Sequence, residues 1–255
     1  MEIIEAHIGF NEYEKEIRED YIYFKEMPTK DQLDNIHIPK VYFNFNIELD
    51  DYEYLKHSNI THILFGKNFN QSIENLPIKL THLRFGEWDD ISKFNDDIDN
   101  LPIGLEELCF SEQSRFNRKI NNLPVKLKKL KLGNNFNQSL DNLPKYLEKL
   151  EIYSIIYNFE LNNLPNSLKI LNLDGKYNKS LDNLPSSLCI LRIPDYYNKP
   201  LNNLPNNLEE LSIENYEYSH NLHNLPSSLK KLIIYKRIEK QVKLPKNCVL
   251  DIYDN

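Results

Sequence analysis

The side chains best suited to catalysis or metal binding are a few histidines, aspartates and cysteines, and their spacing assembles no site. His62 and His82 stand in matching positions 20 residues apart, but a zinc site needs at least three protein ligands. Asp89 and Asp90 lie in a polar stretch, where solvated carboxylates are the ordinary explanation. Cys109 has no neighbouring histidine that could activate its thiol. The sequence also lacks a phosphate-binding glycine loop and a nucleophile-plus-base motif. It therefore predicts a protein that is not an enzyme, with no cofactor and no metal.

Variable side chains that could bind a partner occupy fixed positions instead, five and seven residues after each of eight prolines. The pairs are His82 and Arg84, Glu107 and Cys109, Lys129 and Lys131, Lys149 and Glu151, Ile170 and Asn172, Ile190 and Arg192, Glu210 and Ser212, and Lys231 and Ile233. If these positions are neighbours in space, they form a two-column panel of variable residues. Either a recognition surface or neutral drift of solvated positions would produce this variation.

A basic patch suited to an acidic partner is predicted within this panel, and further contacts are expected beside it. The candidate binding residues are Arg84, Trp88, Lys129, Lys131, Lys149, Glu151 and Arg192. Trp88, the single tryptophan, lies in a local insertion, GEWDDISK, at residues 86–93. Insertions in repeat proteins map to loops on one edge, and tryptophan is enriched at interface hot spots. Trp88 is therefore either a contact residue or packed against the edge of its own repeat.

The elements that position these residues follow from a repeated frame, aromatic-Asn-x-x-(Ile/Leu)-x-Asn-Leu-Pro-x-x-Leu-x-x-Leu-x-apolar. Its prolines are Pro77, Pro102, Pro124, Pro144, Pro165, Pro185, Pro205 and Pro226, spaced by 25, 22, 20, 21, 20, 20 and 21 residues. Self-similarity at such a period indicates a stacked solenoid, in which each coil buries its apolar face against its neighbours.

Within one frame, for example residues 136–152, the last apolar positions alternate with charged ones, as in Leu150 and Ile152. This period of two predicts a half-buried strand. The proline fixes φ, lacks a donor and favours an extended residue before it. The Asn-Leu-Pro segment is therefore expected to be an extended return leg, and about 20 residues leave no room for a helix. The two asparagine positions of the frame are expected to satisfy backbone groups from coil to coil.

The segments FNQSIENLPIKLTHLRFG (69–86) and FNQSLDNLPKYLEKLEI (136–152) resemble FNIP repeats, a leucine-rich-repeat class found mainly in social amoebae and giant DNA viruses. The resemblance extends over about residues 60–252. It implies a mainly β, leucine-rich-repeat-like curved solenoid of ~20–22-residue coils, with one parallel sheet. It also implies a protein-interaction module, which in this family is often fused to an F-box that recruits a ubiquitin ligase. The aromatic position changes from phenylalanine to tyrosine after residue 136, and those hydroxyls are expected to reach solvent or a backbone carbonyl.

The ends of the chain depart from the frame. Residues 69–234 contain eight full repeats, and 55–66 and 236–255 are degenerate coils of the same solenoid, 55–255. Residues 1–54 form a small acidic N-terminal cap, or alternatively a partner-docking element. Within it, residues 12–26 are predicted to form a short helix and 41–49 a strand. No three-helix F-box pattern is present in this segment.

Bulk composition excludes several classes of partner. Residues 1–54 carry 14 acidic and 5 basic side chains, which leaves 38 − 14 = 24 acidic and 31 − 5 = 26 basic in the remainder. Nucleic-acid binding needs a strongly basic face, and no apolar stretch approaches a membrane span. Three cysteines, an odd number, and a start without a secretory pattern are typical of a cytoplasmic protein, in the host if viral.

The sequence thus predicts a non-catalytic protein–protein interaction scaffold that recognises a protein partner, of unknown identity, on its strand face and edge loops. Substrate recruitment to a ubiquitin ligase is a narrower hypothesis, which rests on analogy. The alternative is a structural protein that self-associates through an exposed end or sheet edge.

Overall fold

Each alternating apolar segment of the repeat forms a short strand. The structure, a computed structural model, describes residues 4–7 and 20–253. The strands within the predicted solenoid are β4 (His62–Phe65), β5 (His82–Phe85), β6 (Glu107–Phe110), β7 (Lys129–Leu132), β8 (Lys149–Ile152), β9 (Ile170–Leu173), β10 (Ile190–Ile193), β11 (Glu210–Ile213), β12 (Lys231–Tyr235) and β13 (Val249–Tyr253). Before them come β1 (Ile4–His7), β2 (Asp20–Phe24) and β3 (Lys40–Phe43), with short helices α1 (Lys30–Asp34) and α2 (Glu53–Lys56). A 3-10 helix, η2 (Lys236–Gln241), follows β12.

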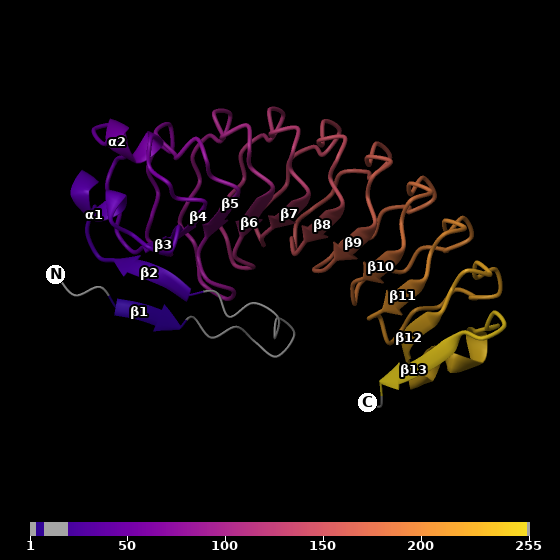
Figure 1. Cartoon of the computed structure of the whole chain (residues 1–255). Coiled ribbons are helices and arrows are strands. Elements are labelled where there is room, and N and C mark those ends of the chain that lie inside the picture. Colours follow the sequence, from indigo (N-terminus) through magenta and orange to yellow (C-terminus); the bar gives the residue numbers. More distant parts are fainter. Residues whose placement is uncertain (1–3, 8–19, 254–255) are drawn as a thin grey trace.

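The strands form one 13-stranded sheet in chain order. β1 and β2 pair antiparallel, and every later neighbour pairs parallel. The register matches the repeat, because His62 of β4 lies beside His82 of β5, which lies beside Glu107 of β6. Figure 1 shows an arch with the strands along its concave side and the turns and short helices on its outer side. The prediction of a curved, mainly β solenoid with one parallel sheet is confirmed.

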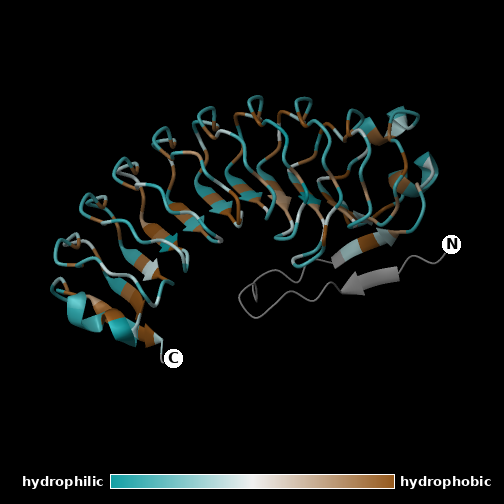
Figure 2. Ribbon diagram, turned by 180° about the vertical axis from the view of Figure 1, so that it is seen from behind, coloured by the Kyte–Doolittle hydropathy of each residue, from teal (hydrophilic) through white to brown (hydrophobic). Residues whose placement is uncertain are grey.

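The core is a continuous column inside the coils. In the eight full repeats the two alternating apolar strand residues, such as Leu130 and Leu132, are buried together with the frame's aromatic, whereas the leucine before the proline is only partly buried in most coils, as at Leu123 and Leu143. The aromatic rings stack from coil to coil, with 6.0 Å between the centroids of Phe94 and Phe116 and 6.2 Å between Phe116 and Phe136. The outer turns are largely hydrophilic, and the apolar segments lie on the strands and inside the coils (Figure 2). Burial against neighbouring coils therefore supplies the stabilisation that one coil alone lacks.

The first asparagine of the frame forms a ladder along the solenoid. The Asn95 backbone N–H donates to Oδ1 of Asn70 in the preceding coil at 2.9 Å. The same bond, at 2.8–3.1 Å, joins Asn117 to Asn95, Asn137 to Asn117, Asn158 to Asn137 and Asn198 to Asn178. The predicted backbone-satisfying role is confirmed for this position. The second asparagine has this role in the first repeat, where the Asn75 side chain donates to the backbone oxygen of Asp50 at 2.9 Å, but in a later coil the Asn163 side chain donates to the Asp141 carboxylate at 2.8 Å.

The tyrosines that replace phenylalanine in the later coils only partly follow the prediction. Tyr218 donates its hydroxyl to the backbone oxygen of Lys199 at 3.0 Å, as expected. The hydroxyls of Tyr157, Tyr177 and Tyr197 are buried without a hydrogen-bond partner among the described residues. The expectation that they reach solvent or a carbonyl is therefore wrong for these three. Burial raises the pKa of all four phenols, because the charged form would lose its hydration.

We expect Tyr157→Phe to leave the free energy of unfolding unchanged or to raise it by up to about 1 kcal/mol, because a desolvated, unpaired hydroxyl opposes folding. Tyr218→Phe is the matched control and should lower it by about 1 kcal/mol, since it removes a hydrogen bond. Urea denaturation of both variants checks this pair. A large loss of stability in Tyr157→Phe would show that its hydroxyl is bonded after all.

Two predictions for the N-terminal segment are wrong. The helix predicted at 12–26 is strand β2 over its described part, and residues 12–19 lie outside the described residues. Tyr21, Ile22 and Phe24 are aromatic and β-branched residues, which favour strands, and the sheet edge at β3 is available to pair with them. The strand predicted at 41–49 ends at Phe43.

The physical reason is that residues 45–49, FNIEL, already begin a coil. Phe45 and Leu49 are buried in the core, and Oδ1 of Asn46 accepts the Asn70 N–H at 2.8 Å as the first step of the asparagine ladder. The alternation of this segment belongs to the aromatic-Asn-x-x-Leu part of the frame and not to a strand.

Candidate protein-binding face

The parallel sheet places the predicted panel on the concave side of the arch. Residues at the first position of each strand, such as His82 and Lys149, are half-buried. The second column is more enclosed than predicted, with Cys109, Lys131 and Glu151 exposed by 7%, 5% and 6%. Crowding on the concave side, together with a loop that folds across part of it, accounts for the difference.

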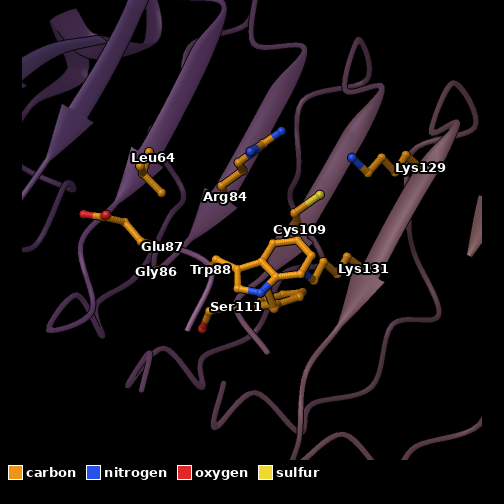
Figure 3. A pocket seen from close by; sticks show the side chains of 10 residues that line it. Leu64, Arg84, Gly86, Glu87, Trp88, Cys109, Ser111, Lys129 and Lys131 are labelled. Carbon is orange, nitrogen blue, oxygen red and sulfur yellow. The ribbon is translucent and has the colours of Figure 1, made fainter. Parts of the chain in front are cut away.

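That loop carries Trp88. Gly86 has φ of +78°, a conformation that favours glycine, and turns the chain away from β5. The Trp88 backbone oxygen then accepts the Glu112 N–H at 3.0 Å, which anchors the loop to the next coil. The indole lies over the strand face, with Nζ of Lys131 3.2 Å from a ring centroid and the Tyr153 ring 6.2 Å away (Figure 3). Trp88 therefore packs on the concave face, where it is half-buried, and not against the edge of its own coil.

The loop separates two hollows on this face. A small cavity of about 30 Å³ under the indole is lined by Arg84, Cys109, Lys129 and Lys131, among others, and Figure 3 shows these side chains. It has room for no more than ordered water. A groove of about 640 Å³ extends from β8 to β13 and begins at Trp88. Lys149, Glu151 and Arg192 line this groove. All seven predicted residues thus line one of two adjacent hollows, with Trp88 bordering both.

Sequence reasoning missed groove residues that lie just beyond the strand ends. These are Tyr153 after β8, Asp174 after β9 and Glu214 after β11. Each occupies the first position after the last core residue of its strand. The repeat spacing could have identified these residues, because an alignment of the copies places them in one column directly after the last core residue of each strand.

Comparisons with known proteins agree with this geometry. The model of the FNIP Repeat family matches residues 57–87, 116–154 and 157–196. The chain contains FNIP repeats. A search of curated proteins found no match.

Among solved structures, the chain is similar to CroV588 of a giant virus, described as a novel circular LRR protein structure. The two share 30% sequence identity with a TM-score of 0.65, over 89% of this chain and 36% of CroV588. YopM from Yersinia enterocolitica WA-314 shares the fold at 16% identity, with a TM-score of 0.51, over 91% of this chain and 61% of YopM. The FNIP-repeat chain therefore spans about a third of the length of CroV588 and less than two thirds of YopM.

Ion pairs within the FNIP coils offset most of the charge of the predicted basic patch. The Glu107 carboxylate lies 3.4 Å from Nε2 of His82, 3.5 Å from Nζ of Lys129 and 3.9 Å from a guanidinium nitrogen of Arg84. Burial alone would raise the pKa of Glu107, but the hydrogen bond to His82 and the charges of Lys129 and Arg84 outweigh it and lower the pKa to about 2.

The two remaining lysines of the patch also have acidic neighbours. Nζ of Lys131 lies 3.6 Å from a Glu112 carboxylate oxygen, and Nζ of Lys149 lies 3.1 Å from one of Glu151. Each of the four basic side chains predicted to suit an acidic partner therefore has a carboxylate neighbour within the protein.

The histidines of the FNIP strands stack and do not converge on a metal. The His62 and His82 rings are parallel within 8° at a centroid distance of 4.0 Å, and each Nδ1 lies 2.8 Å from the hydroxyl of the preceding threonine. No group of three His, Cys, Asp or Glu that could hold a metal occurs in residues 4–7 and 20–253. Over the same residues, no helix has the length and apolarity needed to cross a membrane.

Proposed function

We propose that this FNIP-repeat chain is a non-catalytic scaffold that binds a protein partner on its concave strand face, between Trp88 and the groove's far end at Tyr253. The observation that carries the proposal is the groove of about 640 Å³ across β8–β13, lined by side chains that vary from coil to coil on a constant frame. Concave, preformed surfaces with aromatic and charged linings are typical of recognition sites. Repeat scaffolds of this kind generally serve protein–protein interaction.

We propose that residues 1–54 cap the solenoid of residues 55–255, and that the protein works in the cytoplasm. Delivery of the bound protein to a ubiquitin ligase is one use of such a surface, and co-capture of ligase subunits with the partner would support it.

Affinity capture from a cell lysate tests the binding face. The Arg192 side chain is 46% exposed in the groove and pairs with Glu210 at 3.1 Å. Arg192→Glu should change the amount of the specific partner that is captured, because it reverses a charge in the groove. The matched control is Lys169→Glu, which reverses an exposed lysine, paired with Glu148 at 2.9 Å, that does not line the groove. Equal capture by both variants would contradict the proposal.

Self-association is a second candidate, favoured by the edge strand β13. Val249, Ile252 and Tyr253 are exposed by 58%, 37% and 46%. An exposed apolar edge strand can pair with a second chain. Size-exclusion chromatography with light scattering separates the two functions, because self-association predicts a mass that increases with concentration, whereas a monomer at all concentrations excludes it.

A further inference from the structure

The charges of the groove do not balance. Its ionisable acidic and basic residues are Glu151, Asp174, Glu210, Glu214, Asp251, Lys149, Arg192 and Lys231. Each of the three cations pairs with one carboxylate: Lys149 with Glu151 at 3.1 Å, Arg192 with Glu210 at 3.1 Å and Lys231 with Asp251 at 2.9 Å. Five acids less three cations leave two carboxylates, Asp174 and Glu214, with no ion pair among the described residues.

These two carboxylates belong to a row at the carboxyl edge of the sheet. Asp174 follows β9, Asp195 comes after β10, and Glu214 follows β11. Burial and the neighbouring charges of Asp174 and Asp195 raise the pKa of Glu214 to about 7, although Arg192 on β10 opposes the shift. A neighbouring cation stabilises the ionised form of a carboxyl group whose pKa is raised by burial and like charges.

A serine of the groove wall lies two residues before Glu214. Ser212 of β11 is only 3% exposed, lines the groove and makes no hydrogen bond to any described residue. Its Oγ reaches the solvent of the groove, so a polar group of a ligand can form a hydrogen bond with it there.

The ends of the groove are aromatic. Trp88 and Tyr153 border it at β8, and Tyr253 borders it at β13. Six strands at a spacing of ~4.8 Å span about 24 Å, which corresponds to about seven residues of extended peptide. Aromatic faces bind the stems and cationic heads of arginine and lysine.

We propose that the groove binds an extended, basic peptide segment of the protein partner. A lysine or arginine of that segment lies between Asp174 and Glu214, and a polar group of the segment bonds to the Ser212 hydroxyl. The inference rests on the proposed function, since it names the chemistry of the partner that the concave face binds.

Fluorescence anisotropy with labelled synthetic heptapeptides tests the inference. One peptide alternates arginine with glycine and serine, and a second of equal length carries glutamate in place of arginine. The basic peptide should bind, and Asp174→Asn and Glu214→Gln should each weaken it about tenfold at low salt, because each removes one charge-assisted contact. Glu160→Gln, at an exposed carboxylate outside the groove, is the matched control and should change nothing.

A pH series adds a readout that is specific to Glu214. The charged groups facing this side chain are Asp174, Asp195 and Arg192. Because a cation binds the ionised carboxylate, affinity for the basic peptide should rise by up to about tenfold from pH 6 to pH 8. Glu214→Gln should remove this dependence.

Each outcome decides between the inference and the proposed function. Tighter binding of the acidic peptide, or affinity unaffected by Asp174→Asn and Glu214→Gln, overturns the inference. If Arg192→Glu nevertheless changes partner capture, the concave face still binds a protein of other chemistry. Binding of neither peptide also overturns the inference, and equal lysate capture by Arg192→Glu and Lys169→Glu would then contradict the proposed function as well.

Discussion

Replacing Phe116 by alanine is expected to lower the free energy of unfolding by about 3–5 kcal/mol. Phe116 is 1% exposed and stacks on Phe110 at 4.1 Å, Phe94 at 6.0 Å and Phe136 at 6.2 Å. Its removal leaves a cavity in a column where each coil contacts only its neighbours. The change should therefore also weaken the coupling between the two halves of the solenoid and broaden the unfolding transition.

Phe159→Ala is the matched control for this prediction. Phe159 is 42% exposed, and its ring contact in the described structure is with Tyr157 at 6.0 Å. Its replacement should cost less than about 1 kcal/mol. Chemical denaturation followed by circular dichroism measures both variants. Equal losses would mean that the aromatic column does not hold the coils together.

Replacing Glu107 by glutamine should be the most damaging change on the strand face, with a loss of about 3 kcal/mol at neutral pH. The Glu107 side chain is 25% exposed and lies within 4 Å of His82, Lys129 and Arg84. Glutamine keeps the shape but leaves the nearby cations without their shared counter-charge. The lowered pKa of Glu107, about 2 against 4.5, gives a linkage contribution of similar size, roughly 3 kcal/mol.

The pH dependence separates this charge effect from a packing effect. Because the folded-state pKa of Glu107 is depressed, its contribution is complete above about pH 4.5 and is lost as the pH falls towards 2. The difference in unfolding free energy between the wild type and Glu107→Gln should therefore shrink over that interval. Glu106→Gln is the control, since Glu106 pairs with Lys128 at 2.9 Å at an exposed position and should cost less than about 1 kcal/mol. A pH-independent difference for Glu107→Gln would contradict the electrostatic account.

Much of the fold could be predicted from the sequence because the frame repeats. Leucine and isoleucine at fixed offsets from each proline, such as Leu130 and Leu132, mark both the strands and their inward faces. The segment at 41–49 shows the limit of this reasoning. Alternation in a single, degenerate copy fits a strand, and only the register with Phe69 and Asn70 reveals that Phe45 and Asn46 begin a coil.

The candidate binding face could be predicted less completely, for a physical reason. The panel residues were placed correctly on the concave side by their offsets, yet their exposure depends on contacts between coils that no offset encodes. The Trp88 loop reaches Lys131 two strands away, and Glu107 gathers His82 and Lys129 from the coils on either side of it. Ion pairs between neighbouring strands determine the net charge of the strand face, so a count of lysines along one column of the panel overestimates its positive potential.

Site-specific photocrosslinking in a cell lysate tests the central claim, that a partner lies on the concave face. A photoreactive amino acid is placed at Arg192, in the groove, and in a second variant at Asn206, an exposed residue that does not line the groove. We predict a crosslinked protein adduct from position 192 and none from position 206. An adduct from position 206 alone would contradict the account.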